Sequence, residues 1–585
     1  MAPGLHTQYW SLQLSVIVIG LVLRLIQFLR SDSIWGDEAM LALSVASRSF
    51  NELLRPLAYG QVAPVPFLWA ERLMVQLFGV NEWALRALPL IAGCALCVAM
   101  ALLARRMLRQ DEATVALVLT AFSQILVRYS AEAKPYISDA FLTVVVIGAA
   151  GALIGRMDNK RSWIVLALAG AVAIASALPS VFVCFGVAVA LVTQAFRHKR
   201  VDLLPRIGLL ALSWATLYSL FYFGFYRGPA NAPYMRTFWE GSFLTLGSPR
   251  LLVRTQAALL EWARAVDAGW ALFGLSAVTL ALVVLGIVTL WRRRQESYAL
   301  LLLAPAIAPF AASALGLYPV ASRLLLFAAP LFIMLMAVGA MWAAGKVNAL
   351  IPPVRQRWVA ALLVLPAVTT VLASLFYDRD QQMRPLVQAL KDRWLPGEAV
   401  YVFHRIVPAW LFYSTDWTAP NLEQLAWAMR ISGPGGLGHE NAPSRGPRPS
   451  GEGRHLVYQI DGHPVLLGTS SGIQGRPVFG QTPNEPDSGW AGNEAQRIRD
   501  AASSRIWVIV GQASHDGVDL GEVLLDAARQ AGARVTFQDS LLDGRLYRLD
   551  FKSGTDSEGP GRTIGDTPRT GAGRVIEQPR SAPPG

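Results

Sequence analysis

Charged side chains are scarce in this chain. They make up 16% of its 585 residues, whereas hydrophobic residues make up 53%, and the mean hydropathy is +0.38. A soluble protein of this length carries more charge on its surface, so the composition excludes that class. It indicates a polytopic α-helical membrane protein.

Cysteine is also rare. The three cysteines, Cys94, Cys97 and Cys184, all lie within apolar runs, and the polar C-terminal region has none. This excludes a disulfide framework and a cysteine-based zinc site. Cys94 and Cys97 form a C-x-x-C pattern, but inside a membrane helix we interpret them as small packing residues.

A basic segment before the first apolar run is missing as well. That run, at about 12–29, is longer than the core of a signal peptide, and no small-residue cleavage pattern follows it. We therefore expect it to remain attached as a membrane anchor.

The formal net charge of +12 raises the question of a nucleic-acid partner. The basic residues, however, occur in small clusters between apolar runs. Membrane topology explains such clusters, because Lys and Arg accumulate in cytoplasmic loops. The sequence therefore predicts no nucleic-acid partner.

Apolar runs long enough to cross a bilayer recur through the first two thirds of the chain. We expect about eleven transmembrane helices, near residues 11–30, 83–104, 112–128, 136–155, 163–179, 181–196, 204–223, 269–291, 298–316, 324–344 and 358–377. Residues 163–196 could instead form one kinked span. The alternation of the loop charges favours two helices there.

Alternate loops differ in basic content, as the positive-inside rule requires. One set contains Arg105, Arg106, Arg109, Arg156, Lys160, Arg161, Arg197, Lys199, Arg200, Arg206, Arg292, Arg293, Arg294, Lys346, Arg355 and Arg357. We expect these loops, and the N-terminus, in the cytoplasm. The outer side then holds the segments 31–82, 129–135, 224–268 and 317–323 and everything after about 378.

Two segments of the first outer loop, within 38–80, have the periodicity of amphipathic helices. Residues 38–55 place polar side chains opposite apolar ones, which predicts a helix lying on the membrane. Residues 64–78 begin with Pro64 and predict a second helix. The transmembrane domain, residues 1–378, would thus carry a structured outer cap.

The composition becomes more polar after the last predicted crossing. Strand-like stretches at 399–403, 505–510 and 546–551 alternate with helical periodicity at 384–394 and 520–531. Residues 379–551 therefore predict a small extracytoplasmic α/β domain. Gly and Pro at 432–454 indicate a flexible insertion, and 552–585 is expected to be a disordered tail.

Four polar groups lie at the predicted outer face. They are the pair Asp37 and Glu38, the segment from Arg128 to Tyr136, the segment from Tyr318 to Arg323, and Arg24 near the end of the first helix. Each has an ordinary explanation as rim charge, snorkelling side chain or interfacial aromatic. Together they offer a carboxylate that can take a proton or hold a divalent cation, and cations that stabilise a departing phosphate.

At these residues the chain resembles the GT-C membrane glycosyltransferases, in particular the protein-mannosyltransferase and aminoarabinose-transferase group. The resemblance covers roughly residues 10–380 and rests on Leu23-Arg24-Leu25, Ser33 to Ala39, Gln61 to Pro66, Leu77 to Arg86, Tyr129 to Tyr136 and Arg323 to Pro330. It implies a polyprenyl-phosphate sugar as donor and a lipid, glycan or protein as acceptor. It also implies a bacterial inner membrane as the location, with the C-terminal domain in the periplasm.

The resemblance also implies residue roles. Asp37 matches the acidic catalytic residue, which would act as base toward the acceptor hydroxyl, and Glu38 would support it. Glu132 matches an acidic residue of the second outer loop. Lys134, which stands where relatives often carry Arg, is the first candidate for contact with the donor phosphate. Arg323 is a second candidate for the donor phosphate, and Tyr136 and Arg24 complete the expected substrate-binding residues.

One motif departs from the family pattern. Residues 61–66, Gln-Val-Ala-Pro-Val-Pro, replace the usual His-Pro-Pro run, which removes a His that could hold a metal or position the acceptor. The sequence therefore predicts no definite metal site, although a divalent cation is a candidate cofactor.

The function expected is an inverting sugar transfer on the outer membrane face. The alternative is a polytopic transporter or lipid flippase with an outer binding domain. Transporters, however, usually place their ionisable groups near the bilayer midplane.

Overall fold

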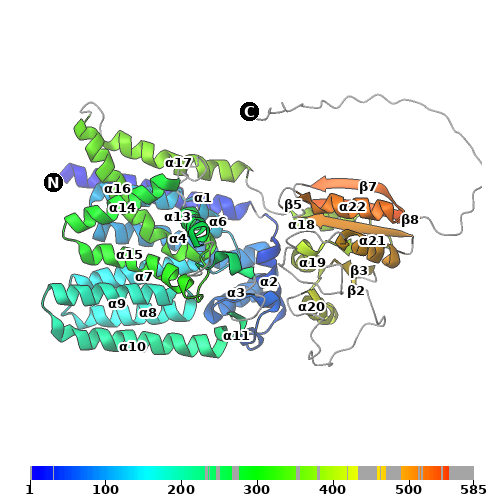
Figure 1. Cartoon of the computed structure of the whole chain (residues 1–585), viewed down its shortest axis with the longest axis horizontal. Coiled ribbons are helices and arrows are strands. Elements are labelled where there is room, and N and C mark those ends of the chain that lie inside the picture. Colours follow the sequence, from blue (N-terminus) through cyan, green and yellow to red (C-terminus); the bar gives the residue numbers. More distant parts are fainter. Residues whose placement is uncertain are drawn as a thin grey trace, which may run out of the picture.

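The computed structural model describes residues 3–30, 32–230, 235, 238–244, 251–266, 276–350, 356–377, 382–417, 419–432, 457–460, 463–468, 489–502, 504–511, 514–515, 518–541 and 544–551. A long helix bundle occupies one end of the molecule, and a smaller part with a β-sheet occupies the other (Figure 1). Helices α2 (Gly36–Ser47) and α3 (Val65–Phe78) lie between them. The expected fold class, a helical membrane protein with a small C-terminal α/β part, is confirmed.

The bundle is built from apolar helices. They are α1 (Pro3–Leu29), α4 (Glu82–Met107), α5 (Gln110–Ala121), α6 (Gln124–Tyr129), α7 (Tyr136–Ile154), α8 (Lys160–Ser176), α9 (Ser180–Arg197), α10 (Leu204–Phe221), α11 (Arg227–Ala230), α13 (Leu251–Val266), α14 (Ser276–Arg292), α15 (Glu296–Ala314), α16 (Ala329–Leu350) and α17 (Gln356–Tyr377). Among the described residues, eight helices are long and apolar enough to cross a membrane. The count of eleven crossings stays a prediction.

One predicted span has an internal break, and the region that could have been one kinked span contains the two helices that we expected. The span at 112–128 is divided into α5 and α6, and the Ser123 hydroxyl caps the second helix by accepting from the Leu126 N–H. Residues 163–196 form two helices, α8 and α9, with Pro179 between them. Pro179 lacks an N–H and favours such a helix start.

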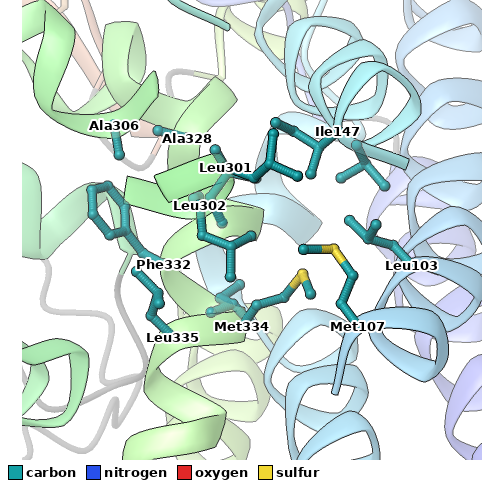
Figure 2. Packing of buried hydrophobic residues seen from close by; sticks show 14 of the residues in the cluster. Leu103, Met107, Ile147, Leu301, Leu302, Ala306, Ala328, Phe332, Met334 and Leu335 are labelled. Carbon is teal, nitrogen blue, oxygen red and sulfur yellow. The ribbon is translucent and has the colours of Figure 1, made fainter. Parts of the chain in front are cut away.

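Helix α16 lies at the centre of the bundle core, where Leu331, Phe332, Met334 and Leu335 are buried (Figure 2). Its approach to α14 depends on Gly286 and Gly339. A Cβ at Gly286 would lie 2.0 Å from the Leu335 carbonyl oxygen. Small residues at such a crossing let two membrane helices pack backbone against backbone.

Residues 32–82, which were predicted to lie on the outer side and are called the outer segment below, are more folded than their sequence predicts. The helix expected at 38–55 is wrong in its second half: α2 ends at Ser47, because Arg48 adopts an extended backbone. Short 3₁₀ helices follow at Glu52–Leu54 and Ala58–Gly60. The second expected helix is present as α3, which begins after Pro64.

The C-terminal part is a mixed sheet with helices. Its helices are α18 (Met383–Lys391), α19 (Val407–Ser414), α20 (Ala419–Ser432), α21 (Trp490–Ala501) and α22 (Leu520–Gln530). Its six-stranded sheet has the order β2-β3-β1-β4-β8-β7, from β1 (Ala399–Val402), β2 (Val457–Ile460), β3 (His463–Leu467), β4 (Arg505–Gly511), β7 (Ala533–Leu541) and β8 (Gly544–Phe551). A small separate pair, β5 (Ser514–His515) and β6 (Val518–Asp519), completes it.

Strand β1 runs parallel to β3 and β4, and β8 runs antiparallel to both β4 and β7. All three predicted strands and both predicted helices are present. Most of the predicted insertion at 432–454, and all of the predicted tail at 552–585, lie outside the described residues.

One apolar core joins the outer segment to the C-terminal part. Ile34, Leu43 and Phe67 belong to the same buried cluster as Val400 and Trp410. Within this cluster α2 packs against α19. The segment that carries the acidic pair is therefore held between the helix bundle and the C-terminal part.

Candidate active site

Asp37 stands in the first turn of α2 and faces two cations. Its Oδ1 lies 3.2 Å from the Lys134 Nζ, and its Oδ2 lies 3.0 Å from an Arg323 guanidinium nitrogen. Burial raises the pKa of Asp37, but Lys134 and Arg323 outweigh it and leave that pKa below its ordinary value. The carboxylate is therefore ionised and bridged between two cations.

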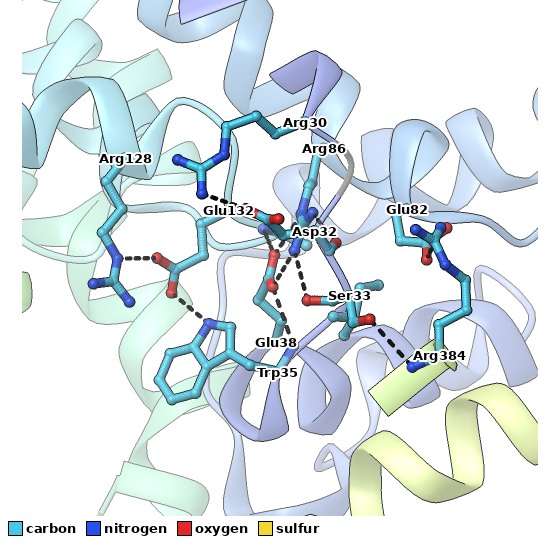
Figure 3. A network of polar contacts seen from close by, with 12 residues as sticks. Arg30, Asp32, Ser33, Trp35, Glu38, Glu82, Arg86, Arg128, Glu132 and Arg384 are labelled. Atoms are coloured by element: carbon cyan, nitrogen blue, oxygen red, sulfur yellow. Dashed lines mark hydrogen bonds and ion pairs between the residues drawn. The ribbon is translucent and has the colours of Figure 1, made fainter. Parts of the chain in front are cut away.

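Glu38 is fully buried and is engaged differently. Its two oxygens accept from the Arg86 Nε at 2.9 Å and from an Arg86 terminal nitrogen at 2.5 Å (Figure 3). The same carboxylate accepts from the Ala133 N–H at 2.7 Å. Glu38 thus ties α2 to α4 and to the loop that carries Lys134, which suits a positioning role.

The loop predicted to be the second outer loop, residues 129–135, lies against the N-terminal end of α2. The Glu132 carboxylate accepts from the Trp35 indole N–H at 3.3 Å and faces Arg128 (Figure 3). A tight turn from Glu132 to Lys134, closed by a 2.7 Å backbone hydrogen bond, directs Lys134 to Asp37. The structure thus brings Asp37, Glu38, Glu132 and Lys134 together.

Lys134 has a second partner that was not among the expected site residues. Its Nζ donates to the Gln61 side-chain oxygen at 2.7 Å, and Lys134 itself is buried. Burial lowers the pKa of Lys134, and the charge of Asp37 opposes that effect. Gln61 is the first residue of the run that departs from the family pattern, and this departure was the only signal for it.

Arg323 comes from a segment that is far from Asp37 in the sequence. It belongs to a 3₁₀ helix, Ser322–Ala328, that leads into α16. The Ser322 N–H donates to the Glu261 carboxylate at 2.8 Å, and the Arg323 guanidinium lies 5.1 Å from the centre of the Trp239 ring. These contacts fix the direction of a side chain that the sequence could place only on the same membrane face.

Tyr136 begins α7 directly after the Lys134 turn. Its ring meets Tyr129 edge to face, with centroids 5.3 Å apart. One turn further, the Asp139 carboxyl group is buried, and its Oδ1 has no hydrogen-bond partner among the described residues.

Arg24 does not join this group. Its buried guanidinium donates to the carbonyl oxygens of Gly20 at 3.0 Å and Thr120 at 3.2 Å. Thr120 is in the last turn of α5, where carbonyl groups have no partner within the helix. Arg24 therefore caps the C-terminal end of α5 at the break between α5 and α6. A substrate role for Arg24 stays a prediction.

The C-terminal part also contacts the segment before Asp37, which sequence reasoning missed. The Tyr413 hydroxyl accepts from the Ile34 N–H at 2.6 Å and donates to the Glu82 carboxylate at 2.8 Å. Arg384 pairs with Glu82 at 2.9 Å, and its N–H donates to the Ser33 hydroxyl (Figure 3). No local pattern reveals a contact across such a sequence separation.

The donor set does not resemble a metal site. Among the described residues, no group of three or more His, Cys, Asp or Glu side chains is placed to hold an ion. The carboxylates of Asp37 and Glu38 face Lys and Arg, which occupy the positions that a divalent cation would need. We therefore derive no step through a metal, and a divalent cation stays a prediction.

Residues 62–219 match the profile of the dolichyl-phosphate-mannose-protein mannosyltransferase family. The predicted resemblance to membrane glycosyltransferases is confirmed. The matched segment contains Glu132, Lys134 and Tyr136 but neither Asp37 nor Arg323. No curated protein gives a significant match to the sequence.

Solved structures of glycosyltransferases show a distant likeness. The chain covers 98% of ArnT from Cupriavidus metallidurans, with 93% of its own length, 13% identity and a TM-score of 0.47. It covers 74% of the oligosaccharyltransferase AglB from Archaeoglobus fulgidus, with 92% of its own length, 14% identity and a TM-score of 0.45. Against the apo oligosaccharyltransferase structure of the same organism it spans 63% of that chain with 69% of its own, at 12% identity and a TM-score of 0.42.

Proposed function

We propose that this membrane glycosyltransferase moves a sugar from a polyprenyl-phosphate donor to a hydroxyl group, with inversion, on the outer membrane face. One observation carries the proposal: the Asp37 carboxylate is held between Lys134 and Arg323, at 3.2 and 3.0 Å. A proton acceptor and two phosphate-binding cations are the groups that such a transfer requires. The family match supports the class of donor.

The reaction is a single displacement. The acceptor oxygen forms a bond to the anomeric carbon while the bond from that carbon to the phosphate oxygen breaks, and Asp37 takes the hydroxyl proton. Polyprenyl phosphate leaves with the electron pair of the broken bond. Attack from the face opposite the leaving group inverts the anomeric centre.

Lys134 and Arg323 stabilise the leaving group. The donor is a phosphodiester with one negative charge, and the departing monoester gains a second one. Arg323 can meet two phosphate oxygens with its planar fork, whereas Lys134 acts as a point charge. Both are held in place, Lys134 by Gln61 and Arg323 beside Trp239.

Donor binding would also raise the pKa of Asp37. Without donor, the two cations keep its pKa below the ordinary value, which makes the carboxylate a weak base. A phosphate that draws Lys134 and Arg323 to itself removes that stabilisation, so the pKa of Asp37 rises toward the value that a proton acceptor needs. The base would thus be strongest when the donor is in place.

The supporting residues keep this arrangement rigid. Glu38 fixes the start of α2 to Arg86, and Glu132 fixes Trp35. We propose that residues 1–378 form the catalytic domain and that 379–551 form an outer domain that holds the Asp37 segment. The protein would sit in a bacterial inner membrane, with its N-terminus in the cytoplasm and its acceptor a lipid, glycan or protein.

The substitution Asp37→Asn tests the proposal. It keeps the side-chain shape but removes the proton acceptor, so we expect sugar transfer to fall about 10²- to 10⁴-fold. Purified protein in nanodiscs would be incubated with a panel of polyprenyl-phosphate sugars, and products would be identified by mass spectrometry.

The control is Asp32→Asn, the same change in the same segment. The Asp32 carboxylate pairs with Arg30 and not with the cations of the site. It should retain most of the activity. An Asp37→Asn protein that inserts and unfolds like the original and still transfers sugar at a similar rate would refute the role of Asp37.

A further inference from the structure

A second group of arginines lies at the opposite end of the bundle from Asp37. Residues at the turns between α4 and α5 and between α14 and α15 line an open hollow of about 620 Å³. Its lining consists of Arg106, Met107, Leu108, Arg109, Arg293, Gln295 and Tyr298. Two turns far apart in sequence thus contribute guanidinium, amide and hydroxyl groups to one space.

The hollow lies at a membrane surface. Helix α4 has Arg86 in the Asp37 site and Arg106 in the hollow, and twenty residues of helix span about 30 Å, the thickness of the hydrocarbon core. Aromatic side chains typical of the lipid headgroup level occur at this end of α4: Tyr298 is in the lining, and Trp10 stacks on Arg105, the residue before Arg106. Figure 1 shows the start of α1 at this end, away from the C-terminal sheet.

The charges around the hollow are only partly balanced. Arg293 pairs with the buried Glu112 at 2.6 Å, and Glu112 also accepts from the Arg109 N–H at 3.1 Å. Among the described residues, no carboxylate pairs with the Arg106 or Arg109 side chain. Two exposed guanidinium groups therefore remain available beside the hollow.

We propose that this hollow binds a phosphate group, as in the headgroup of an anionic lipid or in a free phosphate. Guanidinium forks match phosphate oxygens, and the Gln295 amide and Tyr298 hydroxyl add uncharged donors. The positive-inside rule explains why arginines occur in these turns. It does not require two turns to direct them to one hollow, and the proposal rests on that convergence.

The test compares two double variants of the full-length protein with equal loss of charge. Arg106→Gln with Arg109→Gln removes the two unpaired cations, whereas Arg292→Gln with Arg294→Gln removes neighbouring arginines that do not line the hollow. In one arm, native mass spectrometry counts the anionic lipids retained from nanodiscs of phosphatidylcholine with phosphatidic acid. In the other, inorganic pyrophosphate is titrated against the protein in phosphatidylcholine nanodiscs, and thermal unfolding is followed.

We expect the Arg106/Arg109 variant to bind phosphatidic acid about tenfold or more weakly, and the Arg292/Arg294 variant to bind nearly as the original does. Selective loss in the lipid arm identifies a headgroup site, and selective loss in the pyrophosphate arm identifies a free phosphate site. Equal weakening in both variants, or no binding in either arm, would overturn the proposal. Sugar transfer is not the readout, so this outcome is independent of the proposed activity.

Discussion

Helix α4 has charged residues at both of its ends, and the two ends differ in how these charges are buried and paired. At its first turns, Glu82 pairs with Arg384, and Arg86 pairs with Glu38. At its last turn, Arg105 stacks on Trp10, and Arg106 has no carboxylate partner among the described residues. The first end buries balanced charge, whereas the second leaves positive charge at a surface.

This difference has an energetic consequence. A buried ion pair with one partner removed leaves an uncompensated charge in a medium of low dielectric constant. An exposed arginine is solvated with or without a partner, and its loss costs little stability. Substitutions that remove one partner of a buried ion pair at the Asp37 end should therefore lower stability, while those at the other end should affect ligand binding with little loss of stability.

The largest effect is expected from Glu38→Gln. It leaves the Arg86 guanidinium buried without its carboxylate, so we expect a loss of about 3–5 kcal/mol in the free energy of unfolding. Denaturant unfolding of the protein in detergent would measure it. Glu52→Gln is the matched control, because Glu52 is exposed and, among the described residues, accepts hydrogen bonds from Ser49 alone. Equal stability of the two variants would show that the Glu38 pair does not hold this end together.

A smaller effect is expected from Tyr413→Phe. The change removes the hydroxyl that joins Ile34 to Glu82, so the Asp37 segment becomes less well positioned. We expect kcat to fall about tenfold while KM for the donor changes little, because misplacement of a reacting group costs rate more than binding.

The control for that change is Tyr401→Phe. The Tyr401 hydroxyl is also buried and donates to Glu494 at 2.7 Å, but this contact lies within the C-terminal part. If both variants lost stability and activity equally, the effect of Tyr413 would be general destabilisation. A selective loss of kcat in Tyr413→Phe would show that the C-terminal part positions Asp37.

The sequence revealed the elements of this site better than their contacts. Asp37, Lys134 and Arg323 could be assigned to one membrane face, because loop charges report topology. The partners Gln61 and Tyr413 could not be identified, since their contacts depend on how the outer segment and the C-terminal part share one core. Arg24 illustrates the converse: a charge near a membrane helix end suggests function, but its packing against α5 decides where it points.

The secondary structure, too, was predictable only where it depends on local sequence patterns. Strands such as β4 and helices such as α22 were predictable, because alternation and helical periodicity are local. The end of α2 at Ser47 was not, because residues 48–55 keep a helical pattern although their backbone is extended at Arg48. The break between α5 and α6 was hidden likewise, since an apolar run does not show where helix hydrogen bonds stop.

The smallest effect is a shift in pH dependence, which distinguishes the Asp37 end with and without donor. In the free protein the pKa of Asp37 lies below its ordinary value, so the carboxylate stays ionised at lower pH than a usual Asp. The acidic limb of kcat/KM for the donor, which reports the free enzyme, should therefore lie below the pH at which an ordinary Asp titrates. The limb of kcat, which reports the donor complex, should lie at higher pH if the donor phosphate draws Lys134 and Arg323 from Asp37 as proposed. Rates measured across pH at low and saturating donor concentration, with Asp32→Asn as reference, would show which acidic limb lies at the lower pH. If the limbs of kcat/KM and kcat coincided, the cations would stay with Asp37 when the donor binds.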